Sequence, residues 1–168
     1  MISSENLALF RSWMKEATVT EPNDPNAMFL ATLDASGLPN IRTVLLKSVD
    51  ENGFVFYTNF ESAKGRELLQ NGAACLCFHW KTQKREVTIQ GHVEPVCEVE
   101  ADQYFQSRPR LSRIGAWASQ QSRPLLNRSA LQKEVAKFAI QFGVGAIPRP
   151  KHWGGFRLLP SKVCFYEE

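Results

Sequence analysis

The sequence is poor in cysteine, in long apolar runs and in net charge. Its four cysteines form no paired C-x-x-C units and its three histidines are dispersed, so we expect no metal site. No stretch approaches the ~20 apolar residues that cross a membrane as a helix. The first residues also lack the apolar core of a secretory signal. We therefore expect reduced thiols and a cytoplasmic location.

The composition is that of one folded domain. The chain of 168 residues is 43% hydrophobic and 22% charged, and it contains no repeat, linker or low-complexity tract. We therefore treat residues 1–168 as a single domain. The net charge of +3 suits an anionic small ligand and is too small to indicate nucleic-acid binding.

Periodicity predicts antiparallel strands with interspersed helices. The expected helices are residues 3–17, 62–70, 98–107 and 125–142. The expected strands are residues 27–33, 40–48, 54–59, 73–81, 84–96, 155–159 and 162–166. Because the first three strands follow one another without a crossover helix, we expect an antiparallel meander in a closed or partly closed barrel with helical cover.

Two cationic regions are candidate anion sites. Arg42 and Lys47 lie at the two ends of an otherwise apolar strand. Thr58, Ser62 and Lys64 surround the start of the helix predicted at 62–70, where free N–H groups and the helix dipole favour a phosphate. Simpler explanations stay open, since strand ends reach solvent and a serine caps many helices.

A third polar region follows the helix predicted at 98–107. It contains Tyr104, Arg108, Arg110 and Ser112, and the two arginines flank a proline. Burying such arginines alone would be costly, so solvent or an anion must satisfy them. Arginines and hydroxyls together are typical of phosphate recognition through charge-assisted hydrogen bonds. The three regions together favour a phosphorylated small ligand.

Eight motifs follow one another along the chain. In order they are Arg42-Thr-Val-Leu-Leu-Lys47, Val55-Phe-Tyr-Thr-Asn59, Ser62-x-Lys64, Phe78-x-Trp80, Tyr104-Phe-x-Ser-Arg-Pro-Arg110, Ile114-Gly-Ala-Trp117, Gln121-Ser122 and Trp153-Gly-Gly-Phe-Arg157. This series resembles the pyridoxine/pyridoxamine 5'-phosphate oxidase family, from about residue 27 to residue 166. The resemblance implies a mainly β fold with helices, an antiparallel FMN-binding split barrel of six to seven strands with helical cover. It also implies a homodimer with FMN at the interface, and neither nucleic acid nor membrane as a partner.

The resemblance implies two sets of ligand-binding residues. The cofactor set is Arg42, Thr43, Val44, Leu45, Lys47, Tyr57, Thr58, Ser62, Lys64, Glu86, Gln121, Ser122 and Tyr166. The substrate set is Lys47, Tyr104, Arg108 and Ser112. The implied enzyme is an FMN-dependent oxidase that converts pyridoxine or pyridoxamine 5'-phosphate to pyridoxal 5'-phosphate, with dioxygen as the acceptor. Because the flavin carries the chemistry, no catalytic side chain is assigned.

Two other functions stay open. One is a related flavin oxidase with another substrate, as in the phenazine-biosynthesis oxidases that share this architecture. The other is a flavin-binding protein with little turnover. The second is favoured because the 168 residues include neither the family's C-terminal Arg-Leu-His-Asp/Glu-Arg segment nor its basic N-terminal arm. If the gene product lacks them, we expect an incompletely built substrate pocket.

Two positions depart from the family pattern. Ala63 stands where the family often has an arginine, so one phosphate-binding cation is missing. Glu86 stands where the family has a glutamine, and an ionised carboxylate only accepts hydrogen bonds. Unless Glu86 pairs with Arg85 or is protonated, we expect it to disfavour the reduced, anionic flavin. Comparing the FMN dissociation constant and potential with those of Glu86→Gln tests this, and equal values would contradict it.

Overall fold

The computed structural model describes residues 1–119, 121–124 and 127–168. These residues form one seven-stranded antiparallel sheet with the order β2-β1-β5-β6-β7-β4-β3, and five helices. The strands are β1 (Ala27–Leu33), β2 (Pro39–Leu45), β3 (Ser48–Asp50), β4 (Gly53–Asn59), β5 (Ala73–Trp80), β6 (Arg85–Pro95) and β7 (Trp153–Glu167). The helices are α1 (Ser4–Thr20), α2 (Ala63–Gln70), α3 (Glu98–Ser107), α4 (Arg110–Ala118) and α5 (Arg128–Phe142). The expected fold class, a mainly antiparallel split barrel with helical cover, is confirmed.

The expected strand at 40–48 is in fact two strands with different partners. β2 pairs with β1, whereas β3 pairs with β4, at the other end of the sheet order. The switch occurs at Leu46 and Lys47, where Leu46 N donates to Asn26 O at 2.9 Å and Lys47 N donates to Val55 O at 2.8 Å. The predicted three-strand meander is therefore wrong, because alternation along one segment does not show which neighbour each half pairs with.

The two strands expected at the C-terminus form one strand, β7. Its pairing with β6 shifts register between Gln90 and Gly91, where Gly91 lies opposite Pro160. A proline donates no ladder hydrogen bond and is tolerated where the pairing is irregular. Pro160 and Ser161 therefore interrupt the register of the pairing without ending the strand.

Helix α4 was not predicted. The sequence predicts no helix between residues 107 and 125, but α4 forms there with Pro109 at its N-cap, a position that needs no backbone donor. The helix expected from residue 125 begins in the structure at Arg128, where the side chain of Asn127 accepts from Ala130 N at 2.9 Å. Residues 125–126 lie outside the described residues.

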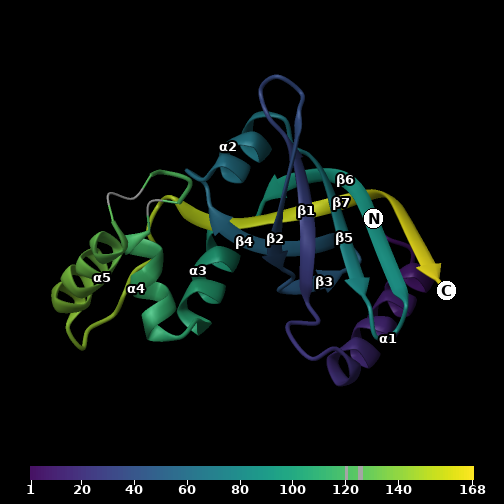
Figure 1. Ribbon diagram of the computed structural model, residues 1–168, viewed down its shortest axis with the longest axis horizontal. Coiled ribbons are helices and arrows are strands. Elements are labelled where there is room, and N and C mark those ends of the chain that lie inside the picture. Colours follow the sequence, from purple (N-terminus) through teal and green to yellow (C-terminus); the bar gives the residue numbers. More distant parts are fainter. Residues whose placement is uncertain (120, 125–126) are drawn as a thin grey trace.

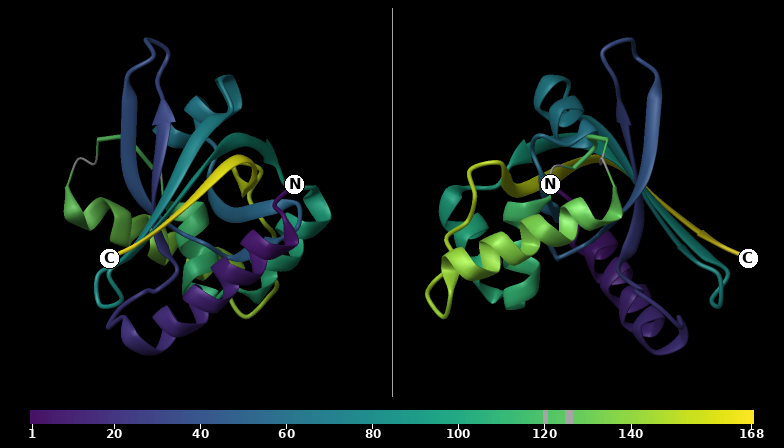
Figure 2. Two further views of the ribbon diagram at one scale, coloured as in Figure 1. Left: turned by 90° about the vertical axis from the view of Figure 1, so that its right-hand side faces the viewer. Right: turned by 60° about the vertical axis from the view of Figure 1, so that its left-hand side comes forward.

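Two apolar clusters hold the molecule together. The larger fills the curled sheet and receives α1, whose Phe10 ring lies 5.1 Å from the rings of both Phe54 and Phe78. The smaller surrounds Phe105 and Trp153 beneath α3, α4 and α5. Figure 1 shows these three helices gathered at one end of the molecule and α1 toward the other, and Figure 2 shows the curled sheet from two further sides. None of the helices among the described residues is long and apolar enough to cross a membrane.

Candidate functional site

One cavity of about 440 Å³ lies between the β2–β3 connection, β4 and the start of α4. It is lined by Thr43, Val44, Leu45, Lys47, Tyr57, Thr58, Lys64, Tyr104, Arg108, Pro109, Ser112, Gln121 and Trp153. The lining includes every member of the substrate set predicted from the sequence and most of the cofactor set. Residues from distant segments of the chain therefore meet at one place.

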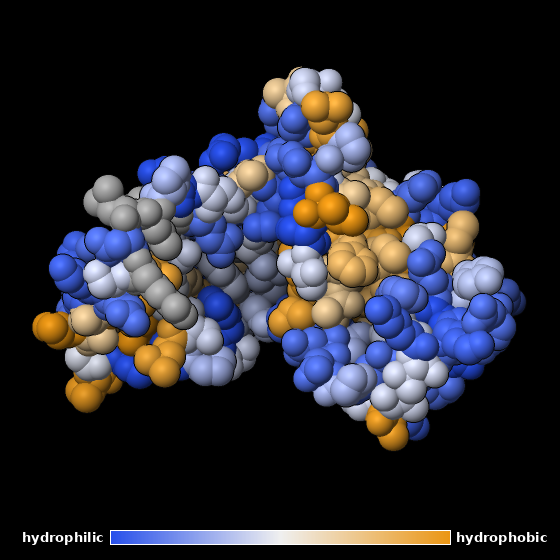
Figure 3. Space-filling model, in the orientation of Figure 1, coloured by the Kyte–Doolittle hydropathy of each residue, from blue (hydrophilic) through white to orange (hydrophobic). Residues whose placement is uncertain are grey.

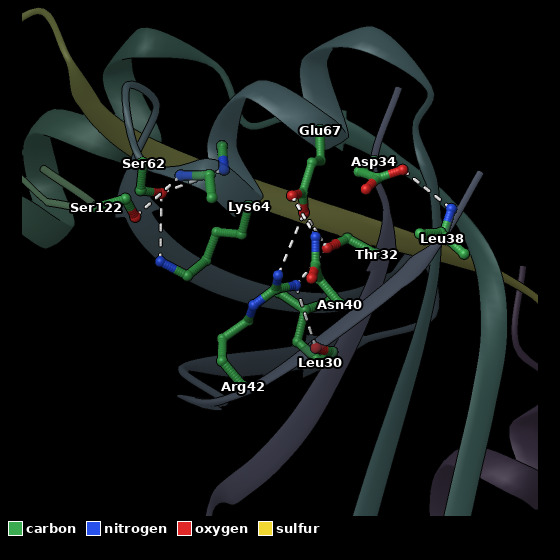
Figure 4. Close-up of polar contacts among 12 residues, drawn as sticks. Leu30, Thr32, Asp34, Leu38, Asn40, Arg42, Ser62, Lys64, Glu67 and Ser122 are labelled. Carbon is green, nitrogen blue, oxygen red and sulfur yellow. Dashed lines mark hydrogen bonds and ion pairs between the residues drawn. The ribbon is translucent and has the colours of Figure 1, made fainter. Parts of the chain in front are cut away.

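The start of α2 forms one end of this cavity. Ser62 caps the helix, since its Oγ accepts from Gly65 N at 3.2 Å. Lys64 Nζ donates to the same Ser62 oxygen at 3.2 Å, and Ala63 N donates to Ser122 Oγ at 3.1 Å (Figure 4). Although Ala63 removes a cation, its backbone still presents an N–H group here, and residues 59 positions apart in the chain converge on a helix N-terminus.

The charge of Lys64 is sensitive to its surroundings. Burial lowers the pKa of its amino group, and the positive charge of Arg42 lowers it further, while Glu67 opposes both effects. Arg42 itself forms an ion pair with Glu67, with Nη2 and Oε2 3.2 Å apart. Sequence reasoning missed Glu67, because a glutamate in a helix usually faces solvent.

Parallel aromatic rings form the opposite wall. The ring of Tyr57 lies 4.0 Å from that of Tyr104 and 5.3 Å from that of Trp153, with interplanar angles of 17° and 9°. Tyr57 lies opposite Gly155 in the β4–β7 pairing, and a Cβ on that glycine would be 2.8 Å from the Tyr57 ring. Burial first, and the charge of Glu100 second, raise the pKa of Tyr57 to about 12. Its phenol therefore stays protonated near neutral pH.

Arg108 lies on the same wall. Its guanidinium carbon is 4.6 Å from the centre of a Trp153 ring, an arrangement that favours a cation–π contact. Burial lowers the pKa of this guanidinium, which is still charged near neutral pH. Within the described part of the chain, the buried Nη1 atom of Arg108 has no hydrogen-bond partner. A buried charged donor of this kind requires an acceptor, and an anionic ligand group would supply one.

Two members of the predicted cofactor set lie elsewhere. Glu86 and Tyr166 face each other across β6 and β7, in a separate depression that also includes His79. Arg85 pairs with Glu16 and Glu167 and forms no ion pair with Glu86 in the described part of the chain. Burial first, and the charge of Glu86 second, raise the pKa of the half-buried Cys77 thiol to about 11.

The cavity fits a flavin phosphate combined with a second phosphorylated molecule. Lys64 and the N-terminus of α2 provide donors at one end, while Arg108 provides a buried donor in need of an acceptor at the other. The aromatic wall, on which Arg108 lies, adds planar apolar surface. The residues present therefore match the chemistry of both ligands.

Comparison with known proteins identifies close relatives. The chain matches the family model described as pyridoxamine 5'-phosphate oxidase over residues 14–142. A Rhizobium johnstonii protein named pyridoxine/pyridoxamine 5'-phosphate oxidase is 57% identical over 166 residues, which are 99% of this chain and 81% of the relative. A protein of the same name from Maricaulis maris is 60% identical over 164 residues, which are 98% of this chain and 74% of the relative.

Two solved structures share the architecture. PhzG from Burkholderia lata 383, crystallised with tetrahydrophenazine-1-carboxylic acid, has a TM-score of 0.91 and 32% identity, covering 98% of this chain and 81% of PhzG. A pyridoxamine 5'-phosphate oxidase-related, FMN-binding protein from Nostoc punctiforme has a TM-score of 0.74 and 15% identity, covering 99% of this chain and 86% of that protein. The second likeness establishes the fold alone.

Proposed function

We propose a function from one premise, that this chain belongs to the pyridoxamine 5'-phosphate oxidase family. The protein is an FMN-dependent oxidoreductase that converts pyridoxine or pyridoxamine 5'-phosphate to pyridoxal 5'-phosphate in the cytoplasm, with dioxygen as the electron acceptor. The observation that carries this proposal is the shared cavity, which brings the predicted substrate set together with the phosphate-binding end of the predicted cofactor set.

The two ends of the cavity have separate tasks. Lys64 and Ser62, together with Arg42 beside them, would hold the FMN phosphate at the start of α2. Lys47 and Arg108 would bind the phosphate of the vitamin, since two cations lining one pocket suit a dianion.

The protein's part in the reaction is to bind and orient the flavin and the substrate. The bound flavin supplies the redox chemistry, taking a hydride equivalent from C4' of the substrate and passing two electrons to dioxygen to give hydrogen peroxide. The stacked Tyr57 and Tyr104 rings would keep the substrate ring against an apolar wall and exclude water. Tyr57, protonated near neutral pH, is available as a hydrogen-bond donor at that wall.

The proposal includes a homodimer. One face of the sheet carries exposed apolar side chains, including Phe29 and Ile41, which are 43% and 70% exposed. Figure 3 shows a pale orange, apolar area over β1 and β5. Glu86 and Tyr166 lie on the same face of the sheet, in register with His79 on β5. A second copy covering this face would bury the apolar area and bring its own Glu86 and Tyr166 toward a cofactor held at the interface. Sedimentation of the purified protein tests this, and a monomer at micromolar concentration would refute it.

FMN affinity should fall with rising pH because of Lys64. Its lowered pKa means that the free protein loses this charge at a lower pH than an ordinary lysine does. A bound phosphate favours the protonated form, so affinity is full below the pKa of the free protein and declines above it. Lys64→Arg keeps its charge throughout and should flatten the profile. The ratio of FMN to riboflavin dissociation constants between pH 7 and 10 measures this, and equal slopes for the two proteins would contradict it.

The function is tested in two stages. The purified protein should bind FMN, seen as quenching of flavin fluorescence and a yellow protein. With FMN bound, pyridoxamine 5'-phosphate, water and dioxygen should yield pyridoxal 5'-phosphate, ammonia and hydrogen peroxide in equal amounts, whereas unphosphorylated pyridoxamine should react poorly. Flavin binding without formation of these products would instead indicate a flavin-binding protein with little turnover.

The likeness to PhzG supports a second candidate. That protein was crystallised with tetrahydrophenazine-1-carboxylic acid, whose carboxylate is also an anion. In this candidate, Lys47 and Arg108 would bind a carboxylate of a reduced tricyclic substrate in place of a phosphate. Oxidation of such a compound in the same peroxide assay, at a higher kcat/KM than for pyridoxamine 5'-phosphate, would favour it.

A further inference from the structure

Glu67 lies behind the arginine expected to bind the cofactor phosphate. It belongs to the second turn of α2, and its side chain is only 10% exposed. Three donors meet its carboxylate: Asn40 Nδ2 lies 2.8 Å from Oε1, while Arg42 Nη2, at 3.2 Å, and the Thr32 hydroxyl both contact Oε2 (Figure 4). Three donors on one buried carboxylate fix it in place.

The same contacts fix the guanidinium of Arg42. Its Nη1 donates to Thr32 Oγ1 and to the carbonyl oxygen of Leu30, and its Nη2 donates to Glu67. An arginine has five N–H hydrogens, and in the described part of the chain these contacts use three of them. The Nε–H and the second Nη2–H, which point the same way on the planar fork, are left for a ligand.

The remaining edge of Arg42 lies close to Lys64. In Figure 4, Lys64 and Glu67 lie on different sides of the Arg42 guanidinium. The charge of Arg42 also contributes to the lowered pKa of Lys64, so the two cations act on the same region. Two parallel N–H groups beside a lysine suit bidentate binding of a phosphate.

Resting on the proposed FMN function, we propose that Glu67 is a positioning residue that fixes Arg42 for the cofactor phosphate. Glu67 does not contact the phosphate itself. Together with Thr32, it occupies the inner side of the guanidinium and thereby turns the Nε–Nη2 edge toward the phosphate site.

Two effects of Glu67 oppose each other. Its negative charge reduces the attraction of the site for a phosphate, so a purely electrostatic role would make its removal strengthen FMN binding. Its hydrogen bonds hold Arg42, so a positioning role would make its removal weaken FMN binding. The second effect should dominate, because glutamine has one acceptor oxygen where the carboxylate has two, so its NH2 group must face either Asn40 or the donors Thr32 and Arg42. The direction of the change therefore separates the two roles.

The test compares FMN with riboflavin, which has the same ring system and no phosphate. Glu67→Gln should raise the FMN dissociation constant about 10-fold and leave that of riboflavin within about twofold, as measured by quenching of flavin fluorescence. Thr32→Val keeps the side-chain shape and removes the hydroxyl that joins Glu67 to Arg42. Thr32→Val should likewise raise the FMN dissociation constant and leave that of riboflavin nearly unchanged. It serves as the test if Glu67→Gln does not fold.

Glu61→Gln is the matched control. Glu61 precedes the same helix, is 57% exposed and pairs with Arg123, so this variant removes the same charge without touching Arg42. Its FMN dissociation constant should stay within about twofold of the wild-type value. Tighter or unchanged FMN binding in Glu67→Gln, or equal weakening of FMN and riboflavin, would overturn the positioning role. A wild-type protein that binds neither flavin would instead overturn the proposed function.

Discussion

Arg108→Met should raise the KM for pyridoxamine 5'-phosphate about 100-fold and leave the FMN dissociation constant within about twofold. The reason is that Arg108 lines the cavity and its buried Nη1 atom has no hydrogen-bond partner among the described residues. A charge-assisted hydrogen bond to phosphate contributes roughly 1.5–3 kcal/mol, which corresponds to one to two decades of affinity. Methionine keeps an apolar stem for packing against Trp153, so the variant should lose only its binding of the substrate's anionic group.

Arg108→Lys tests whether the planar guanidinium group matters in addition to its positive charge. Lysine keeps the positive charge but lacks the planar fork that stacks on Trp153, so its KM should lie between those of the wild type and Arg108→Met. Steady-state kinetics with saturating FMN measure all three proteins. If KM is unchanged in both variants, Arg108 does not bind the substrate phosphate.

Gly65→Ala should destabilise the protein by about 3 kcal/mol and abolish measurable FMN binding. A Cβ at residue 65 would lie 2.5 Å from the backbone oxygens of Asn59 and Phe60, which side-chain rotation cannot relieve. The start of α2 would have to move away from β4, and the donors around Ser62 would move with it. Urea unfolding followed by circular dichroism gives the stability, and flavin fluorescence gives the binding.

Gly115→Ala provides a comparison within another helix. Nothing lies within 4 Å of a Cβ at residue 115 in α4. Alanine is favoured over glycine inside a helix, so this variant should be more stable than the wild type by about 0.5–1 kcal/mol. A free energy of unfolding for Gly65→Ala no lower than that of the wild type would show that α2 is not held tightly against the loop before it.

The sequence was informative about the strands and less so about how they pair. Alternation placed β1, β5 and β6 to within a residue or two, because one face of each is buried in the core. β4, buried on both faces, was placed as closely by the turn that precedes it. It did not reveal the change of partner at Leu46 and Lys47, which depends on contacts between distant segments. It also missed α4, because arginines around Pro109 are as typical of a loop as of a helix start.

The candidate site was predicted mainly from a resemblance in motif order. Composition and spacing alone indicated three polar regions, and they gave no reason to place Lys64, Arg108 and Lys47 around one cavity. Glu67 carried no signal, since its partners Thr32 and Asn40 become neighbours only when β1 and β2 pair beneath α2. Such supporting contacts depend on tertiary packing, which a linear pattern does not encode.

The change of strand partner at Leu46 and Lys47 links ligand occupancy to the mechanics of the sheet. The backbone there passes from the β2 end of the sheet order to the β3–β4 end, and Lys47 faces the cavity from that point. A ligand that contacts β2 through Arg42 or Thr43, and β4 through Tyr57 or Thr58, bridges two strands that lie near opposite ends of the sheet order. The binding free energy that depends on both contacts opposes separation of the two strands. Local fraying of the sheet and release of the ligand are therefore coupled.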